Sequence, residues 1–407
     1  MYCPCCKKWF TKCPYQREHY TQKDVQMVQD HLDGLSLRRL VERYGSNRQD
    51  LGKRITKIIG SFKTCGRITK ELVAANSYQG ILVFDGKFVP CKKDTMIPHD
   101  GVLPRSKKRR KIQHGMVWMP YTDYHTHDIP VFIAASSENT YDARLGFKAL
   151  KELRYPLVSV TCDKSLRLIA AVLAEYPNAL IQYCIRHYIV DIQRKLKILN
   201  YRRTIKGIAN KIDEINYDGH AFIRLSSRSR VVRLVNQMLG LINQYEIIND
   251  FYETAIAMLS AKDIRQRNSK RRYLEEIFFK KYFQLEPSKT YRARILKIYQ
   301  QMRKDKHHLF IHLQHPKLGI PSTTNLNEGY NSQLENRIFS IRGFESIATC
   351  ACYGNALILK RRFQRFTDCK GKFKHCNGKS PLELAGVDTS KLKNWIRFSI
   401  KKTASEK

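Results

Sequence analysis

Residues 157–188 read LVSVTCDKSLRLIAAVLAEYPNALIQYCIRHY, and this stretch decides the fold of the chain. LVSVTC is a short apolar, β-branched run typical of a buried strand, and apolar residues at helical spacing predict a helix from Ser165 to Tyr176. ALIQYC is a second apolar run. The order strand, helix, strand indicates an α/β core, and Asp163 stands at the carboxyl end of the first strand, where open α/β sheets place their ligands.

Two aspartates that follow predicted strands each have a structural alternative. Asp163 can simply cap the helix after it, since aspartate is a favoured N-cap residue. Asp85 lies in GILVFDGKFVP (80–90), where the functional interpretation places it at the end of a central strand. The alternative for Asp85 is a β-hairpin turn, because Asp-Gly between two short β-rich runs is a hairpin signal.

A third carboxylate, Glu328, lies in PSTTNLNEGYNSQLENRI (321–338), which begins with a breaker and helix-capping residues and then turns helical. A capping-box role near Asn325 is its structural alternative. Three carboxylates at the ends of separate elements suit two-metal phosphoryl chemistry, in which acidic oxygens hold two divalent ions about 3.5–4 Å apart. Mg²⁺ prefers carboxylates, phosphate oxygens and water, so this set indicates Mg²⁺ (or Mn²⁺) as the cofactor.

The charge of the chain points to a polyanionic partner. Its 407 residues are enough for two or three domains, and they include 74 Lys and Arg against 36 Asp and Glu, a formal net charge of +38. So large a positive field repels itself unless a polyanion accompanies it, and nucleic acid is the leading candidate. No apolar run approaches the roughly 18 residues that span a bilayer, and the N-terminus lacks the apolar region of a secretory signal. We therefore expect no membrane partner.

The twelve cysteines are irregularly spaced in a large basic chain, which favours a reducing compartment. We expect the protein in the cytoplasm or nucleoid, or in the nucleus of a eukaryote. Cys3 and Cys6 have the two-residue gap of a zinc knuckle, and YCPCCKKWFT resembles half of a zinc ribbon. A second pair with good spacing is missing, so Zn²⁺ at these two residues is a hypothesis beside the alternative of free surface cysteines.

Residues 21–62 have the pattern of a helix-turn-helix, with Asn47 to Ile59 as the candidate recognition helix. The alternative is an ordinary three-helix bundle with a solvated basic face, but the global charge favours DNA binding. A long loop from Cys91 to His114 carries a second basic run, of the kind that contacts phosphates or solvent. The predicted DNA-binding residues of the helix and the loop are Arg48, Gln49, Lys53, Arg54, Lys57, Lys107, Lys108, Arg109 and Arg110.

Further along, residues 81–187 are predicted to run strand, strand, strand, helix, strand, helix, strand, which indicates a mixed sheet with helices on its faces. Residues 189–318 are poor in Gly and Pro and helical in period, so we expect an all-α insertion. The expected domains are a partial zinc-ribbon-like segment (1–20), a helix-turn-helix domain (21–66), a first core part (78–190), the insertion (191–318), a second core part with the Glu328 helix (319–366) and a basic C-terminal tail (367–407).

Three stretches together resemble one family. VFDGKF, TCDKSLRLIAAVLAEYPNALIQYCIRHY and STTNLNEGYNSQLENRIFSIRGF are similar to the motifs of DDE transposases of the Mutator-like superfamily and their bacterial insertion-sequence relatives. The resemblance implies that Asp85, Asp163 and Glu328 are the catalytic, metal-binding residues. It maps the family's Cys-x-x-His onto Cys184 and His187, to which we assign a role in shaping the site. Asn331 and Arg337 lie on the glutamate motif, and Arg337 is a further predicted DNA-binding residue.

The resemblance also implies an architecture and a reaction. We expect an RNase H-like mixed-sheet core interrupted by an all-α insertion, with an N-terminal helix-turn-helix domain. The implied activity is cleavage of phosphodiester bonds at element ends and transfer of the 3′-hydroxyl strand into target DNA. Its partners are double-stranded DNA, as terminal inverted repeats and target, and further copies of the chain in a homodimer or higher oligomer on DNA. The rival interpretations are a non-catalytic DNA-binding regulator derived from a transposase, another RNase H-like nuclease, and a basic scaffold protein.

Overall fold

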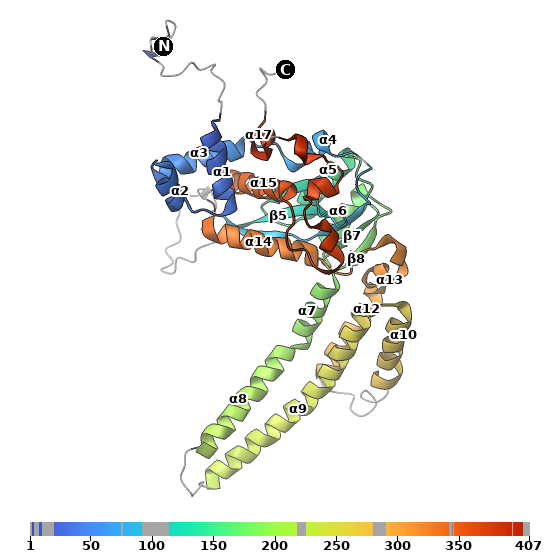
Figure 1. Cartoon of the computed structure of the whole chain (residues 1–407). Coiled ribbons are helices and arrows are strands. Elements are labelled where there is room, and N and C mark those ends of the chain that lie inside the picture. The colour runs from blue at the N-terminus through green and yellow to red at the C-terminus, as the bar shows by residue number, and fades with distance from the viewer. Residues whose placement is uncertain are drawn as a thin grey trace, which may run out of the picture. The chain divides into compact units, whose positions relative to one another are not determined.

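The computed structural model describes residues 2–3, 8–9, 20–74, 76–91, 114–217, 225–279, 290–341, 344, 346–392 and 394–401. These residues form a mixed α/β structure with a mixed sheet of six strands (Figure 1). The α/β class predicted from the sequence is therefore confirmed. The chain divides into two compact units, which are Met1–Val158, Leu166–Asn178 and Asn325–Lys407 for the first, and Ser159–Ser165 and Ala179–Thr324 for the second. Among the described helices, none is long and apolar enough to cross a bilayer.

The first unit begins with short helices whose ends follow capping rules. Thr21 and Asp24 form a capping box, and Gly34 takes the left-handed conformation (φ 109°) that ends the first helix. Ser36 and Asn47 cap the next two helices with their side chains. The elements of this region are β1 (Tyr2–Cys3), β2 (Lys8–Trp9), α1 (Gln22–Asp33), α2 (Leu37–Tyr44), α3 (Arg48–Gly60) and α4 (Cys65–Leu72).

Asp85 and Gly86 interrupt a long strand of the sheet. On either side of them lie β3 (Ile81–Phe84) and β4 (Lys87–Cys91), and both pair antiparallel with β5 (His114–Asp123). The register is continuous across the interruption, since Phe84 lies opposite Tyr121 and Lys87 opposite Trp118. A hairpin would instead pair β3 with β4, so the hairpin alternative for Asp85 is wrong. β6 (Val131–Ala135) also pairs antiparallel with β5.

Helices cover both faces of these strands. Trp118 and Tyr121 lie three positions apart on β5 and therefore point to opposite faces. The Tyr121 hydroxyl donates to the Ala143 carbonyl of α5, at 2.7 Å. A side chain at Gly354 in α15 would come within 2.7 Å of the Trp118 ring, so α15 packs closely on the other face. The helices of this region are α5 (Thr140–Glu152), α6 (Leu166–Glu175), α14 (Asn325–Ile341) and α15 (Ile347–Phe363).

The basic C-terminal segment carries short folded elements. The ring of Trp395 stacks on Phe363 of α15, with centroids 5.8 Å apart, and its indole N–H donates to Gln29 of α1. Lys63 donates its backbone N–H to the Ser399 carbonyl. The elements are η3 (Gly371–Cys376), α16 (Pro381–Leu384), η4 (Thr389–Lys391) and α17 (Trp395–Ser399).

The second unit joins two parallel strands to a long run of helices. β7 (Ser159–Cys162) and β8 (Leu180–Tyr183) pair in parallel and are largely buried. Hydrogen bonds from Tyr201 to Gln244 and from Arg202 to Tyr245 hold α8 and α9 side by side (Figure 1). The helices are α7 (Ile185–Leu196), α8 (Ile198–Tyr217), α9 (Leu225–Leu259), α10 (Ile264–Arg272), η1 (Tyr273–Phe278), α12 (Thr290–Leu309), α13 (Ile311–Gln314) and η2 (Pro316–Leu318).

Candidate functional site

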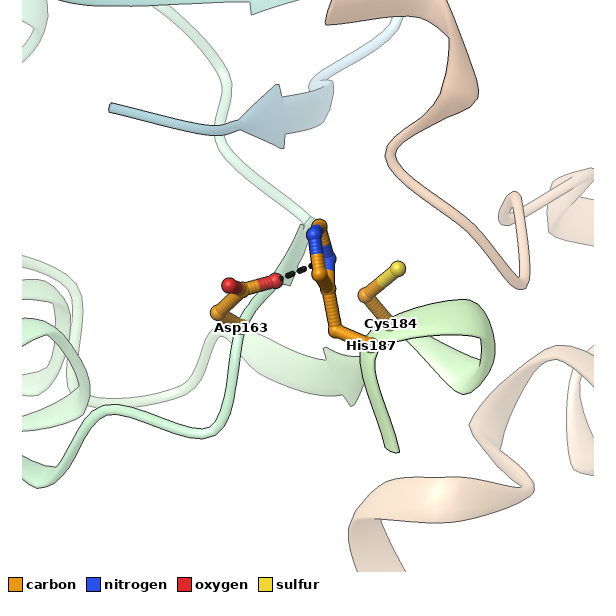
Figure 2. A group of neighbouring side chains, drawn as sticks. All are labelled: Asp163, Cys184 and His187. Carbon is orange, nitrogen blue, oxygen red and sulfur yellow. Dashed lines mark ion pairs between the residues drawn. The ribbon is translucent and has the colours of Figure 1, made fainter. Parts of the chain in front are cut away.

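Asp163 belongs to a three-residue cluster in the second unit. It directly follows β7, while Cys184 and His187 stand at the start of α7 (Figure 2). The Nδ1 atom of His187 lies 2.5 Å from a carboxylate oxygen of Asp163. One ligand atom from each of the three residues lies within 4.8 Å of the other two, which is a spacing that can hold a metal ion. The family resemblance implied a role for Cys184 and His187 in shaping the site of Asp163, and both residues lie beside it.

The charge state of His187 follows from its neighbours. The hydrogen bond to Asp163 raises the pKa of His187 to about 11, with a further contribution from Cys184 and some opposition from burial. The imidazole is therefore protonated at neutral pH, and it neutralises the carboxylate that it contacts. A cation that binds Asp163 has to compete with this ion pair.

Cys184 is a buried thiol whose pKa is lowered. Burial alone would raise its pKa, but hydrogen bonds from His187 and Thr324 outweigh burial and lower the pKa. The Thr324 hydroxyl and backbone N–H lie 3.3 and 3.4 Å from the sulfur. Cys184 is also the N-cap residue of α7, where the helix dipole favours an anion. With a residue exposure of 1%, the sulfur is shielded from bulk solvent.

Lys164, the residue after Asp163, is held by the buried carboxylate of Asp305. Lys164 donates to the Asp305 carboxylate of α12 at 2.5 Å, and the Tyr188 hydroxyl donates to the same carboxylate at 2.7 Å. Asp305 is buried, so these partners compensate its charge where water does not reach. Sequence reasoning missed Lys164 and Asp305, because an aspartate within a lysine-rich helix carries no local signal of burial. Thr324 was also missed as a partner of Cys184, although it lies in the quoted glutamate motif.

Asp85 and Glu328 belong to the first unit, where two amides of α14 fix the helix against β3. Asn331 donates to the Asp85 carboxylate at 2.9 Å, and Asn327 donates to the Val83 carbonyl at 3.2 Å. Glu328 is half-buried and lies three residues before Asn331, so the two share a helix face. Within the described residues, the Oδ1 atoms of Asn327 and Asn331 are buried without a hydrogen-bond partner.

The predicted DNA-binding side chains on α3 are solvent-exposed. Arg54 is also held in the fold, since its guanidinium lies 2.5 Å from the Asp24 carboxylate of α1. Arg337 of α14 lies against Gly34 at the end of α1, where a side chain would collide with the guanidinium. Cys6 and the basic run at Lys107, Lys108, Arg109 and Arg110 fall outside the described residues, as does the side chain of Cys3. The exposed residues of α3 are Arg48, Gln49, Lys53, Arg54 and Lys57.

The candidate site residues thus form two sets, one in each unit. In the first, Asn331 joins Asp85 to the helix that carries Glu328, and in the second, Asp163 is associated with His187 and Cys184. Carboxylates can hold divalent cations, and a protonated imidazole can hold a phosphate oxygen. No protein-family model and no curated protein matches the sequence.

Proposed function

We propose that the protein is a DDE-type DNA transposase with an RNase H-like core, similar to the Mutator-like superfamily. In this proposal Asp85, Asp163 and Glu328 meet at one metal-dependent site. The hydrogen bond from Asn331 to Asp85 is the observation that carries it, because it joins two motifs 246 residues apart in the sequence. The hydrogen bond places the strand interruption at Asp85 beside the helix that carries Glu328.

The residues around Asp85 fit a hydrated divalent cation. Asn331 donates its amide N–H to the Asp85 carboxylate. The Oδ1 atom of Asn331 is buried and has no hydrogen-bond partner among the described residues. A buried acceptor of this kind costs roughly 1–3 kcal/mol unless water or an ion satisfies it. Carboxylate and amide oxygens with water are the ligands that Mg²⁺ and Mn²⁺ prefer. When bound, the ions would activate the attacking hydroxyl and neutralise the leaving oxygen.

The chain's own groups have distinct tasks in the proposed reaction. Water attacks a phosphodiester at the element end and frees a 3′-hydroxyl, which then attacks target DNA in line. Positioning and charge neutralisation dominate such a reaction, since little covalent chemistry falls to the protein. His187 orients the Asp163 carboxylate, and its proton can be directed to a phosphate oxygen when the carboxylate binds a cation. The +38 charge and the exposed basic face of α3 would hold the DNA.

The enzymatic proposal is tested with matched pairs of variants. The substrate is supercoiled plasmid DNA carrying the sequences that flank the gene, incubated with Mg²⁺ or Mn²⁺. We expect Asp163→Asn, Asp85→Asn and Glu328→Gln to abolish nicking while DNA binding persists. Glu335→Gln is the control, because Glu335 lies two turns along α14 in an exposed ion pair with Lys87 and should leave nicking unchanged.

Two results would contradict the enzymatic proposal. Nicking by Asp163→Asn at the wild-type rate would reject the assignment of the site. A wild-type protein that binds the flanking DNA but never nicks it would favour the non-catalytic regulator instead.

A further inference from the structure

A basic groove in the first unit lies on the same helix as Glu328. Its volume is about 510 Å³, and it is lined by α14, by the C-terminal part of α15, by the residues that follow α15 and by Leu32 of α1. Among the described residues, four cationic side chains line it, together with the carboxylate of Asp368. The cations are Arg337, Lys360, Arg361 and Arg365. A concave surface that gathers four positive charges is a candidate anion site.

Two of the cations are held in place by acidic partners. Lys360 lies 2.5 Å from the Asp33 carboxylate and also donates to the Leu32 carbonyl at 3.0 Å. Arg365 lies 2.7 Å from the Glu383 carboxylate. These ion pairs fix the positions of the charges without occupying every donor, since an ammonium has three N–H groups and a guanidinium five. The remaining donors are available to a ligand.

Arg361 differs from the other cations of the groove. Its guanidinium lies 4.6 Å from the centroid of the Phe366 ring and 5.3 Å from that of Tyr330. Within the described part of the chain it has these cation–π contacts but neither a hydrogen bond nor an ion pair. The two rings fix the plane of the guanidinium, and the residue is half-buried. A partly desolvated cation that makes no direct ion pair with the described residues is suited to a bidentate phosphate contact.

We propose that this groove binds the phosphate backbone of the DNA substrate a few nucleotides from the bond that is cut. The proposal rests on the proposed function. Arg337 follows Glu328 by nine residues on α14, which is about 13 Å along a helix axis. DNA advances about 3.4 Å per nucleotide along its axis, so the groove would contact the backbone about four nucleotides from the scissile bond. The amides of Gln333, Asn336 and Gln364 line the groove and provide further donors for phosphate and sugar oxygens.

The salt dependence of binding tests the groove without requiring catalysis. A short mixed-sequence DNA duplex is titrated with the full chain, without metal, over a series of salt concentrations. The slope of log K against log salt is negative, and each lost phosphate contact makes it shallower by about 0.9. We expect this decrease in steepness for Arg361→Gln and for Arg365→Gln. Arg361→Lys should keep the wild-type slope, since it retains the charge.

The control is Arg67→Gln, which removes an arginine as exposed as Arg365 and similarly ion-paired, 3.0 Å from Glu71 of α4, outside the groove. Thermal melting of each variant shows whether the fold is intact. An unchanged slope for folded Arg365→Gln and Arg361→Gln would overturn the proposal, as would an equal decrease for Arg67→Gln.

A second arm locates the contact and separates the two proposals. Neutral methylphosphonate linkages are placed one at a time along a nicking substrate, and wild-type nicking is measured. We expect a loss centred about four nucleotides from the nick, and no further loss at that position for Arg361→Gln. If methylphosphonate lowered nicking only at the scissile linkage, the groove proposal would be overturned while the proposed function would stand. Absence of wild-type nicking would overturn the proposed function, and the salt slopes would still decide the groove.

Discussion

At the scale of single residues, the sequence located the acidic groups but not the partners that hold them. The family resemblance implied that Cys184 and His187 belong to the site of Asp163, and the three side chains lie in one cluster. The partners of Asp85 and of Lys164, which are Asn331 and Asp305, come from distant helices. Their choice depends on how helices pack, and a single sequence carries no signal for it.

His187 gives the protein a pH-dependent stability whose sign can be stated. Its hydrogen bond to Asp163 raises its pKa to about 11 from an ordinary 6.5, so its contribution is full below pH 6.5 and falls as the pH rises towards 11. The lowered pKa of Cys184 acts in the opposite direction, but only below the ordinary thiol value of 9.0. Between about pH 9 and 11, the unfolding free energy of the wild type should therefore fall more than that of His187→Gln.

Urea unfolding across that pH range measures the difference, with His307→Gln, an exposed histidine of α12, as the control. Parallel curves for wild type and His187→Gln would show that the ion pair does not form in solution.

The buried pair of Arg362 and Asp128 should be the most costly single contact to break. Both side chains have 0% exposure, and the guanidinium donates to both carboxylate oxygens at 2.7 and 2.8 Å. Arg362→Met leaves Asp128 charged and buried, which costs about 3–5 kcal/mol of unfolding free energy. Arg365→Met breaks an exposed pair and should cost less than about 1 kcal/mol. Chemical denaturation of both variants checks the ranking, and equal losses would contradict it.

At the scale of elements, most helices and strands followed from periodicity and capping residues. The functional interpretation placed Asp85 at the end of a central strand, and β3 ends at Phe84, directly before it. The sequence did not show that β3 and β4 both pair with β5, because a β-rich pattern does not specify which strands pair. The C-terminal elements are held by the packing of Trp395 on α15 and α1.

Helix α14 should act as the support that positions Asp85 for a metal ion. Asn331→Ala removes the amide that holds the carboxylate, and the loss of such a supporting hydrogen bond typically costs about 10–100-fold in metal affinity. Mn²⁺ binding followed by electron paramagnetic resonance measures this effect separately from folding. Asn336→Ala, an exposed position on the same helix, should leave Mn²⁺ affinity unchanged. Equal affinities for Asn331→Ala and the wild type would show that Asn331 has no such role.

At the scale of the whole molecule, composition predicts the class of partner. A net charge of +38 favours a polyanionic partner, whatever reaction the chain performs. A protein that makes about 6–10 phosphate contacts loses about 10³–10⁵-fold in DNA affinity between roughly 50 and 200 mM salt. We expect a loss in that range for wild-type protein on any duplex, measured by fluorescence anisotropy. A loss of less than about tenfold would indicate that the charge serves another partner.

The central claim is that three carboxylates from distant parts of the sequence share divalent cations. Anomalous X-ray diffraction from crystals of the full chain soaked in Mn²⁺ tests it most directly. The account predicts Mn²⁺ density with oxygen ligands from Asp85, Asp163 and Glu328 together. Mn²⁺ held by Asp163, His187 and Cys184 alone, or no density near Asp85 and Glu328, would contradict it.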